Sequence, residues 1–151
     1  MRGLDKLHPK VRAKAEALIE RCKAVGLLIL ITETLRSKAE QDALYAKGRT
    51  TPGAIVTKAP YPRSAHCWAV AFDFCRATGA DKFAEGTDGF WAKVGAIGKE
   101  LGLFWGGDFK TLKGDFGHFE DPEFVPNNST ANLILKYQTP GNFFATFGMA
   151  A

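Results

Sequence analysis

The sequence predicts an α+β fold in which a small antiparallel sheet packs against helices. Stretches 10–25 and 88–101 carry apolar residues at three- and four-residue intervals among charges, which is the pattern of amphipathic helices. Short apolar runs at 27–32, 69–74 and 103–105 have the length of strands. With 151 residues, of which 46% are hydrophobic, the chain is long enough for one domain with its own core.

The N-terminal part supplies a helix, a buried strand and a second, short helix. The first helix ends at Gly26, and the isoleucine-rich run 27–32 is continuous rather than alternating, which is typical of a buried strand. Ser37 and Glu40 have the spacing of a capping box, which predicts a helix over residues 38–47. The first strand therefore lies between two helices in chain order.

The middle of the chain combines a long loop with an alternating strand. Residues 49–63 are interrupted by prolines and form a loop, of a length that often carries function inside a compact domain. Val70, Phe72 and Phe74 are expected to face a core, while Asp73 lies on the opposite face of the same strand. The strand therefore presents one carboxylate away from the core.

The C-terminal third continues the sheet and ends in a helical and an aromatic segment. The strand candidate 103–105 leads through a turn and the connection 111–114 to an apolar run at 116–119. Residues 130–137 are predicted as the one short helix of the remaining chain. The phenylalanines near the end are expected to pack: Phe143, Phe144 and Phe147.

The chain is weakly basic, and its charges are not gathered into a run. A formal net charge of +4 favours an anionic partner such as nucleic acid, a membrane surface or a cell-wall polymer, but a solvated basic surface explains it equally well. The longest apolar run, 24–31, is too short to span a bilayer. The amino terminus has no signal-peptide core, and three cysteines without Cys-x-x-Cys spacing indicate synthesis in a reducing cytosol.

Two groups of potential metal ligands are separated in the chain: His66 with Asp73, and His118 with Asp115. Two histidines and one carboxylate suit zinc and leave a fourth position open for water, for which Asp115 is a ready general base. His66 and Asp73 alone are more often a structural pair, and their odd separation requires a bend before both can reach one ion. His8 lies outside both groups and is expected at the surface. The full set indicates a zinc hydrolase.

Three motifs follow one another along the chain: Leu35-Arg36-Ser37 with Glu40-Gln41, Ser64-x-His66 with Ala71-x-Asp73, and Trp105-Gly106-Gly107-Asp108 with Asp115-x-x-His118-Phe119. Together they resemble the zinc D-alanyl-D-alanine carboxypeptidases and the L-alanyl-D-glutamate endopeptidases of phage lysins. The resemblance covers residues 4–120 and implies a single peptidase domain over residues 1–151, with 121–151 as a C-terminal extension. The chain departs from the family signature at Ala69, where the signature has glycine.

The resemblance implies a complete metal site and catalytic set on the sheet of the α+β fold. It implies that zinc (Zn2+) binds His66, Asp73 and His118, and that Asp115 is the general base. It also implies that Arg36 polarises or holds the scissile carbonyl. Arginine suits that task because it stays charged and presents several donors to a developing oxyanion.

Three further residues are expected near the substrate. By the same resemblance, Ser64 and Gln41 help to bind it. Trp105 is expected to line the cleft, although a core position is the commoner place for a tryptophan.

The resemblance implies metal-assisted hydrolysis of the L-Ala–D-Glu bond in the stem peptide of bacterial peptidoglycan, leading to cell lysis. Two alternatives stay open, a D-Ala-D-Ala carboxypeptidase and a non-catalytic module that binds the cell wall. Without a signal peptide or a wall-targeting domain, the sequence predicts a monomeric phage or prophage endolysin, made in the host cytoplasm and released by a separate pore. Neither nucleic acid nor stable membrane insertion is expected.

Overall fold

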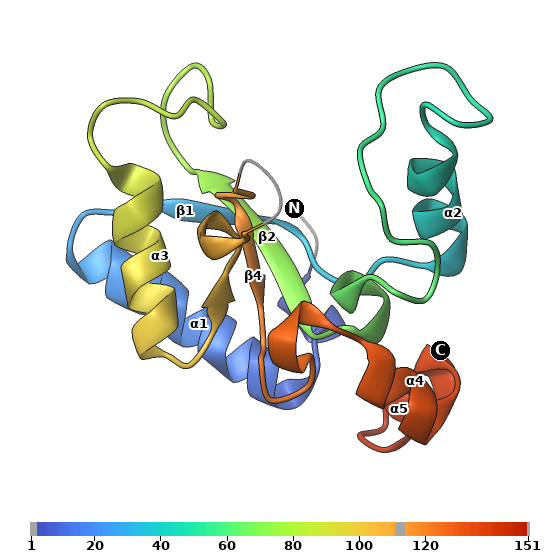
Figure 1. Ribbon diagram of the computed structural model, residues 1–151. Coiled ribbons are helices and arrows are strands. Elements are labelled where there is room, and N and C mark those ends of the chain that lie inside the picture. The colour runs from blue at the N-terminus through green and yellow to red at the C-terminus, as the bar shows by residue number, and fades with distance from the viewer. Residues whose placement is uncertain (1–2, 111–113, 151) are drawn as a thin grey trace.

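The computed structural model describes residues 3–110 and 114–150 and confirms the predicted α+β fold (Figure 1). Its sheet has antiparallel strands in the order β1-β2-β4-β3. The strands are β1 (Ile29–Glu33), β2 (Ala71–Arg76), β3 (Phe104–Trp105) and β4 (His118–Glu120). Most of the predicted connection 111–114 lies outside the described residues.

Helices α1 (Pro9–Ala24) and α3 (Phe90–Glu100) pack together against the sheet (Figure 1). The close approach of α3 depends on Gly98, because a Cβ added there would lie 2.2 Å from Cε1 of Phe119 in β4. The buried side of α1 is a row of small and aliphatic residues: Val11, Ala15, Leu18 and Cys22. The two long helices predicted from apolar periodicity are therefore confirmed.

The two faces of the central strands differ in polarity. Phe72 and Phe74 of β2 and Phe119 of β4 are buried on the helix-covered face, where their rings pack together. Because side chains alternate along a strand, Asp73 and His118 point to the other face, and the strand register pairs these two residues directly. The sheet thus carries its polar groups on the face opposite the helices.

Helix α2 (Lys38–Ala46) and the loop that follows it stand beside the sheet, on the right in Figure 1. The predicted capping box is present: the Ser37 hydroxyl accepts from the Glu40 N–H, and the Glu40 carboxylate accepts from the Ser37 N–H. After the loop, the chain returns to the sheet through a short 3-10 helix, η2 (Ala65–Trp68).

A sharp bend separates η2 from strand β2. It is made at Ala69, whose φ of 58° and ψ of 27° lie in the left-handed region. This region is unfavourable for alanine by about 1–2 kcal/mol, whereas glycine adopts it readily. The bend required by the odd spacing of His66 and Asp73 is therefore made by an alanine, at the position where the family signature has glycine.

The C-terminal segment contains two helices where the sequence predicts one. Helix α4 (Ala131–Tyr137) matches the prediction, and α5 (Pro140–Ala145) follows it. The prediction missed α5 although its start carries a normal signal: Thr139 accepts from the Asn142 N–H, and Pro140 occupies the first helical position. Such a short helix is stabilised mainly by packing, here by two buried phenylalanines.

Aromatic side chains of the C-terminal segment pack against the start of α1. The ring centroid of Phe143 lies 5.5 Å from that of His8 and 6.0 Å from that of Trp68. Nδ1 of His8 also accepts from the Lys10 N–H and caps α1. The packing expected for Phe143 is confirmed, and the expected surface position of His8 is wrong, because its ring is half-buried among these aromatic residues.

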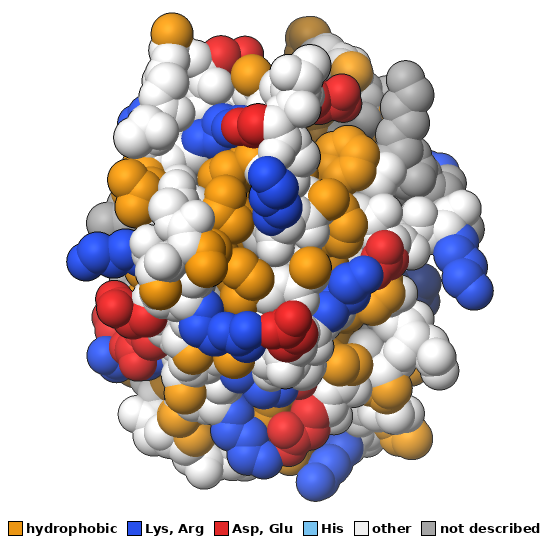
Figure 2. Space-filling model, turned by 90° about the vertical axis from the view of Figure 1, so that its left-hand side faces the viewer, with side chains coloured by type: hydrophobic (Ala, Val, Ile, Leu, Met, Phe, Trp, Pro, Cys, Tyr) orange, Lys and Arg blue, Asp and Glu red, His pale blue; other side chains and the backbone are white. Residues whose placement is uncertain are grey.

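The molecular surface mixes charges of both signs. On the face shown in Figure 2, lysines and arginines lie beside acidic and hydrophobic side chains. The basic residues of this face are therefore part of a mixed, solvated surface. Within residues 3–110 and 114–150, no helix combines the length and the hydropathy that crossing a membrane requires.

The left-handed conformation of Ala69 gives a stability prediction. We expect Ala69→Val to lower the free energy of unfolding by more than about 2 kcal/mol, because a β-branched residue is poorly accommodated at this φ and the site is fully buried. Ala69→Gly should stay within about 1 kcal/mol of the parent, since relief of backbone strain offsets the lost methyl group and the freer unfolded chain. Urea unfolding followed by circular dichroism measures both changes. If both substitutions lowered the free energy of unfolding equally, the left-handed backbone at residue 69 would not be the cause of the effect.

Candidate metal centre

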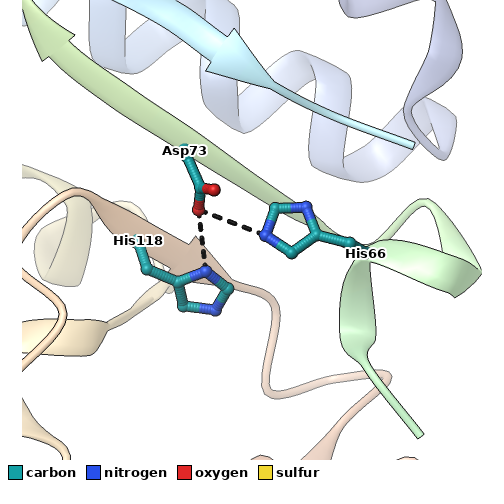
Figure 3. A group of neighbouring side chains, drawn as sticks. All are labelled: His66, Asp73 and His118. Carbon is teal, nitrogen blue, oxygen red and sulfur yellow. Dashed lines mark hydrogen bonds and ion pairs between the residues drawn. The ribbon is translucent and has the colours of Figure 1, made fainter. Parts of the chain in front are cut away.

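Three potential metal ligands converge on the polar face of the sheet (Figure 3). His66 comes from η2, Asp73 from β2 and His118 from β4. Oδ1 of Asp73 lies 3.1 Å from Nε2 of His66 and 2.9 Å from Nδ1 of His118. One ligand atom from each side chain lies within 4.8 Å of the other two. The bend at Ala69 and the pairing of β2 with β4 therefore bring the three predicted ligands to one point.

The ring of His66 is oriented by the backbone. Its Nδ1 lies 2.8 Å from the carbonyl oxygen of Thr34, and because a carbonyl only accepts, Nδ1 carries the hydrogen. The pairing register of β1 shifts between Ile31 and Glu33, an irregularity that re-aims the strand just before Thr34. In the neutral ring, Nε2 is left with its lone pair directed at Asp73, as in a ligand histidine.

The ring of His118 is oriented by side chains instead. Its Nε2 lies 3.0 Å from Oε2 of Glu120, and Oε1 of Glu120 accepts from Nδ2 of Asn128 at 2.7 Å. Both His118 and Glu120 are buried. A carboxylate on the far nitrogen of a ligand histidine fixes the ring and makes the near nitrogen more basic. Asn128 therefore acts on His118 through Glu120.

The charges of the cluster are tightly coupled. Burial alone would raise the pKa of Asp73, but the two histidines outweigh it and hold the pKa of Asp73 well below its usual range. Burial alone would lower the pKa of His118, but the hydrogen bonds and charges of Asp73 and Glu120 raise that pKa to about 10. In the metal-free protein, His118 is thus an imidazolium that bridges two carboxylates, and a metal must displace its Nδ1 proton to bind.

The donor set fits a divalent metal ion. The outer nitrogens of His66 and His118 are taken by hydrogen bonds, so the inner nitrogens and the Asp73 carboxylate all face one point. Electron-rich atoms at this separation repel unless a proton or a cation lies between them. Two imidazoles and one carboxylate are also a set that zinc accepts in catalytic sites while keeping one position open. The cluster could therefore hold a metal ion.

The ligands lie in a cavity of about 460 Å³ that Asp115 and Arg36 also line. Partial burial raises the pKa of Asp115, and the charge of Asp73 adds to this effect, while His118 and His66 oppose it. A carboxyl group whose pKa is moved toward neutrality exchanges protons with a substrate more effectively than an ordinary one. The two residues predicted to be catalytic therefore share one cavity with the three potential metal ligands.

Arg36 is held at the cavity by two side-chain partners. Its side chain is 13% exposed, its Nη2 lies 3.8 Å from the Glu33 carboxylate, and its Nη1 donates to Oε1 of Gln41 at 3.0 Å. Gln41 is 0% exposed, and its Nε2 donates to the carbonyl of Ala59 at 2.6 Å. Both ends of the buried Gln41 amide are thus engaged in holding Arg36 and the loop of residues 49–63, and the substrate contact expected of Gln41 stays a prediction.

Ser64 and Trp105, both expected near the substrate, lie in different environments. Ser64 lines the cavity, and its hydroxyl makes no capping bond to η2. Trp105 is 8% exposed, packs over Gly107 and donates from Nε1 to the carbonyl of Phe116 at 2.8 Å. Trp105 is therefore a core residue that supports the loop next to Asp115, and the substrate contact expected of it stays a prediction.

The chain resembles known peptidases in sequence and in fold. A profile of the M15 peptidase family, described as D-alanyl-D-alanine carboxypeptidase, matches residues 57–121. The peptidoglycan L-alanyl-D-glutamate endopeptidase CwlK of Bacillus subtilis (strain 168) is 40% identical over an alignment of 129 positions that covers 80% of this chain and 75% of CwlK. The chain belongs to the M15 peptidase family. The crystal structure of the Serratia marcescens L-Ala D-Glu endopeptidase ChiX matches this M15 fold with a TM-score of 0.55, at 23% identity, over 78% of this chain and 81% of ChiX.

Sequence reasoning missed two groups that orient the potential metal ligands of this M15 peptidase. The Thr34 carbonyl leaves no trace in the sequence, because every residue has a backbone carbonyl. Asn128 lies beyond residue 121, where the family profile ends. The available signal in the sequence was the pair of consecutive asparagines, Asn127 and Asn128, because asparagine adopts positive φ more readily than most residues. In the structure their φ values are 55° and 59°.

The raised pKa of His118 predicts how the stability of the metal-free M15 peptidase depends on pH. Because this pKa is higher in the folded than in the unfolded chain, the group stabilises the fold fully below about pH 6.5 and loses that contribution as the pH rises toward 10. We expect the free energy of unfolding to fall from about pH 6.5 to 8.5, by at most about 1.4 kcal/mol per pH unit. Urea unfolding with a chelator present measures this slope. Glu120→Gln, which removes one of the two carboxylates, should make it shallower, and a flat profile in the parent would contradict the assignment.

The hydrogen bond from Asn128 to Glu120 predicts an effect on metal affinity. We expect Asn128→Ala to weaken metal binding by about tenfold, because Glu120 then holds the ring of His118 less firmly. Competition with a chromogenic chelator measures the affinity. Asn127→Ala is the matched control, since it also replaces an asparagine of positive φ but leaves the bond to Glu120 in place. An equal loss in the two variants would assign the effect to the backbone turn and not to the hydrogen bond.

Proposed function

We propose that this M15 peptidase is a zinc-dependent endopeptidase that hydrolyses the L-Ala–D-Glu bond in the stem peptide of bacterial peptidoglycan. The observation that carries the proposal is that Asp115 and Arg36 line the same cavity as the three potential metal ligands. The name of CwlK, an L-alanyl-D-glutamate endopeptidase at 40% identity, supports this substrate class. Peptide hydrolysis needs an activated water, a base and a positive group near the carbonyl oxygen, and the cavity offers residues for each.

The side chains would divide the reaction between them. A zinc ion held by His66, Asp73 and His118 would supply a water of lowered pKa and a Lewis acid for the scissile carbonyl. Asp115 takes the proton of the attacking water and passes it to the leaving amine. Arg36 donates to the carbonyl oxygen as negative charge develops there.

Two neighbouring residues would assist. Gln41 acts indirectly, because its Oε1 accepts from Arg36 and so positions the guanidinium at the cavity. Ser64 lines the cavity with a hydroxyl that does not cap η2, so it can bond to the backbone of a bound peptide.

A D-Ala-D-Ala carboxypeptidase is the nearest alternative, because the matching family profile carries that description. A carboxypeptidase needs a pocket that closes around a terminal carboxylate. Asp73 and Asp115 also border a second cavity, of about 310 Å³, so open space continues past these two residues beyond the first cavity. A polymer that extends past the cleaved bond in both directions fits this arrangement better than a chain end.

A non-catalytic wall-binding module is the other alternative. A binding module could retain the fold and even the metal, but it would have no use for a base with a shifted pKa beside the ligands. The raised pKa of Asp115 and the anchored guanidinium of Arg36 therefore favour an enzyme.

The biological setting is a further part of the proposal. The three sequence motifs resemble those of phage lysins, which supports a monomeric endolysin, made in the host cytoplasm, released by a separate pore and causing cell lysis. CwlK is a bacterial protein, so a wall peptidase of the bacterium itself is the alternative setting.

Digestion of purified peptidoglycan tests the proposed activity. We expect the zinc-loaded protein to release stem peptides with a new amino terminus at D-Glu, and mass spectrometry identifies them. A chelator should abolish the cleavage, and added zinc should restore it. Loss of only a terminal D-Ala would assign a carboxypeptidase, and intact peptidoglycan with zinc bound would favour the binding module.

Removal of the proposed base tests the mechanism. We expect Asp115→Asn to lower kcat by about a hundredfold or more, because the attacking water and the leaving amine lose their proton acceptor and donor. Zinc affinity should stay within about threefold of the parent, since Asp115 is not one of the three ligands. Steady-state kinetics and chelator competition give the two values. Full activity in this variant would exclude Asp115 as the base.

A further inference from the structure

Two cavities meet at Asp73 and Asp115 and differ in the other side chains that line them. Asp73 and Asp115 border both of them, so the two cavities meet at the reacting centre. One runs along the segment between α2 and η2, on the right in Figure 1, and the other lies under the loop between β2 and α3, at the upper left. A bound chain that passes over the metal would therefore enter one cavity on each side.

The first cavity has a cationic arm, defined here by Lys58 and Arg63. Both side chains are exposed, and no carboxylate of residues 3–110 or 114–150 pairs with either. Two hydrogen bonds hold the backbone of this wall: Gln41 donates to the carbonyl of Ala59, next to Lys58, at 2.6 Å, and Thr130 donates to the carbonyl of Arg63 at 3.2 Å. Two unpaired cations on an anchored wall form a preorganised place for carboxylates.

The second cavity has an aromatic arm, defined here by Phe83 and Phe116. Phe83 is 65% exposed and Phe116 is 38% exposed, and both line the cavity together with Trp91. Neighbouring exposed aromatic side chains of this kind often mark a binding surface. Glu85 lines the same cavity and is exposed, so this arm is apolar and negative, and carboxylates are disfavoured there.

The stem peptide has a matching asymmetry. On the amino side of the L-Ala–D-Glu bond, L-Ala is joined directly to the lactyl group of the muramyl sugar, which has a methyl group and an apolar ring face. On the carboxyl side, D-Glu continues the chain through its γ-carboxyl group, so its α-carboxylate is free. The scissile bond therefore separates an apolar, sugar-bearing half from a half that carries negative charge.

We propose that the cleft fixes the direction of the stem peptide, with the α-carboxylate of D-Glu on Lys58 and Arg63 and the muramyl group on Phe83 and Phe116. The proposal rests on the proposed function, because it assumes that the cleaved bond lies between these two groups. Attraction of the D-Glu α-carboxylate to Lys58 and Arg63 and its repulsion from Glu85 favour the same orientation of the bound peptide. The two arms would thus determine which amide bond of the stem peptide reaches the metal.

Binding of intact peptides tests the direction separately from catalysis. The protein is the zinc-loaded Asp115→Asn variant, which should bind without cleaving. The probes are the muramyl tripeptide with a free D-Glu α-carboxylate, its α-amide, and the same tripeptide with acetyl in place of the muramyl group. Isothermal titration calorimetry gives the dissociation constant of each at low and at high salt.

We expect Lys58→Gln and Arg63→Gln each to raise the dissociation constant of the acid about fivefold at low salt, less at high salt, and to leave that of the amide unchanged. Phe116→Ala should weaken only the muramyl peptides, at either salt concentration. Lys23→Gln, which removes an exposed lysine of α1, is the matched charge control and should change nothing. Arg63→Lys should restore most of the affinity for the acid.

Equal effects of Lys58→Gln and Arg63→Gln on acid and amide, or no effect on either, would overturn the proposed direction. So would a loss in Phe116→Ala that does not depend on the muramyl group. Circular dichroism checks that each variant is folded. Failure of the proposed function is a separate result: in that case the parent does not cleave between L-Ala and D-Glu, whatever the peptides bind.

Discussion

The candidate metal centre depends on one close contact, in which the Asp73 carboxylate oxygen lies within hydrogen-bond distance of two imidazole nitrogens. Such a group of electron-rich atoms is stable only when other parts of the fold hold each side chain in place and a proton or cation lies among the facing atoms. The surrounding fold provides that support: β2 and β4 place Asp73 opposite His118, the bend at Ala69 turns His66 back, and a layer of phenylalanines anchors both strands from the other face.

Residues distant in the sequence hold the cavity wall as well as the ligands. Gln41 of α2 connects Arg36 to the loop at Ala59, and Thr130, in the segment before α4, bonds to the carbonyl of Arg63 at the other end of that loop. Asn128, from the same C-terminal segment, supports Glu120. The residues after 121 are thus part of the construction of the site, although they lie outside the family profile.

Much of this was predictable because local signals coincided with the fold. Apolar periodicity located the long helices, a capping box located α2, and the alternation around Asp73 placed it on the polar face. The roles of Gln41 and Trp105 were not predictable, because a motif gives residue types and spacing but not which polar groups are buried. Whether Gln41 touches substrate or a neighbouring arginine depends on contacts between segments far apart in the chain.

The two histidines of the candidate metal centre differ in what holds them, and this has an evolutionary consequence. His66 is oriented by the backbone carbonyl of residue 34. Every residue has this group, so no substitution at position 34 removes the hydrogen-bond acceptor of His66. His118 is oriented by Glu120 and Asn128, each of which a single codon change can alter. Natural variation among homologues should therefore tune the metal centre on the His118 side, while the His66 side stays constant as long as the backbone does.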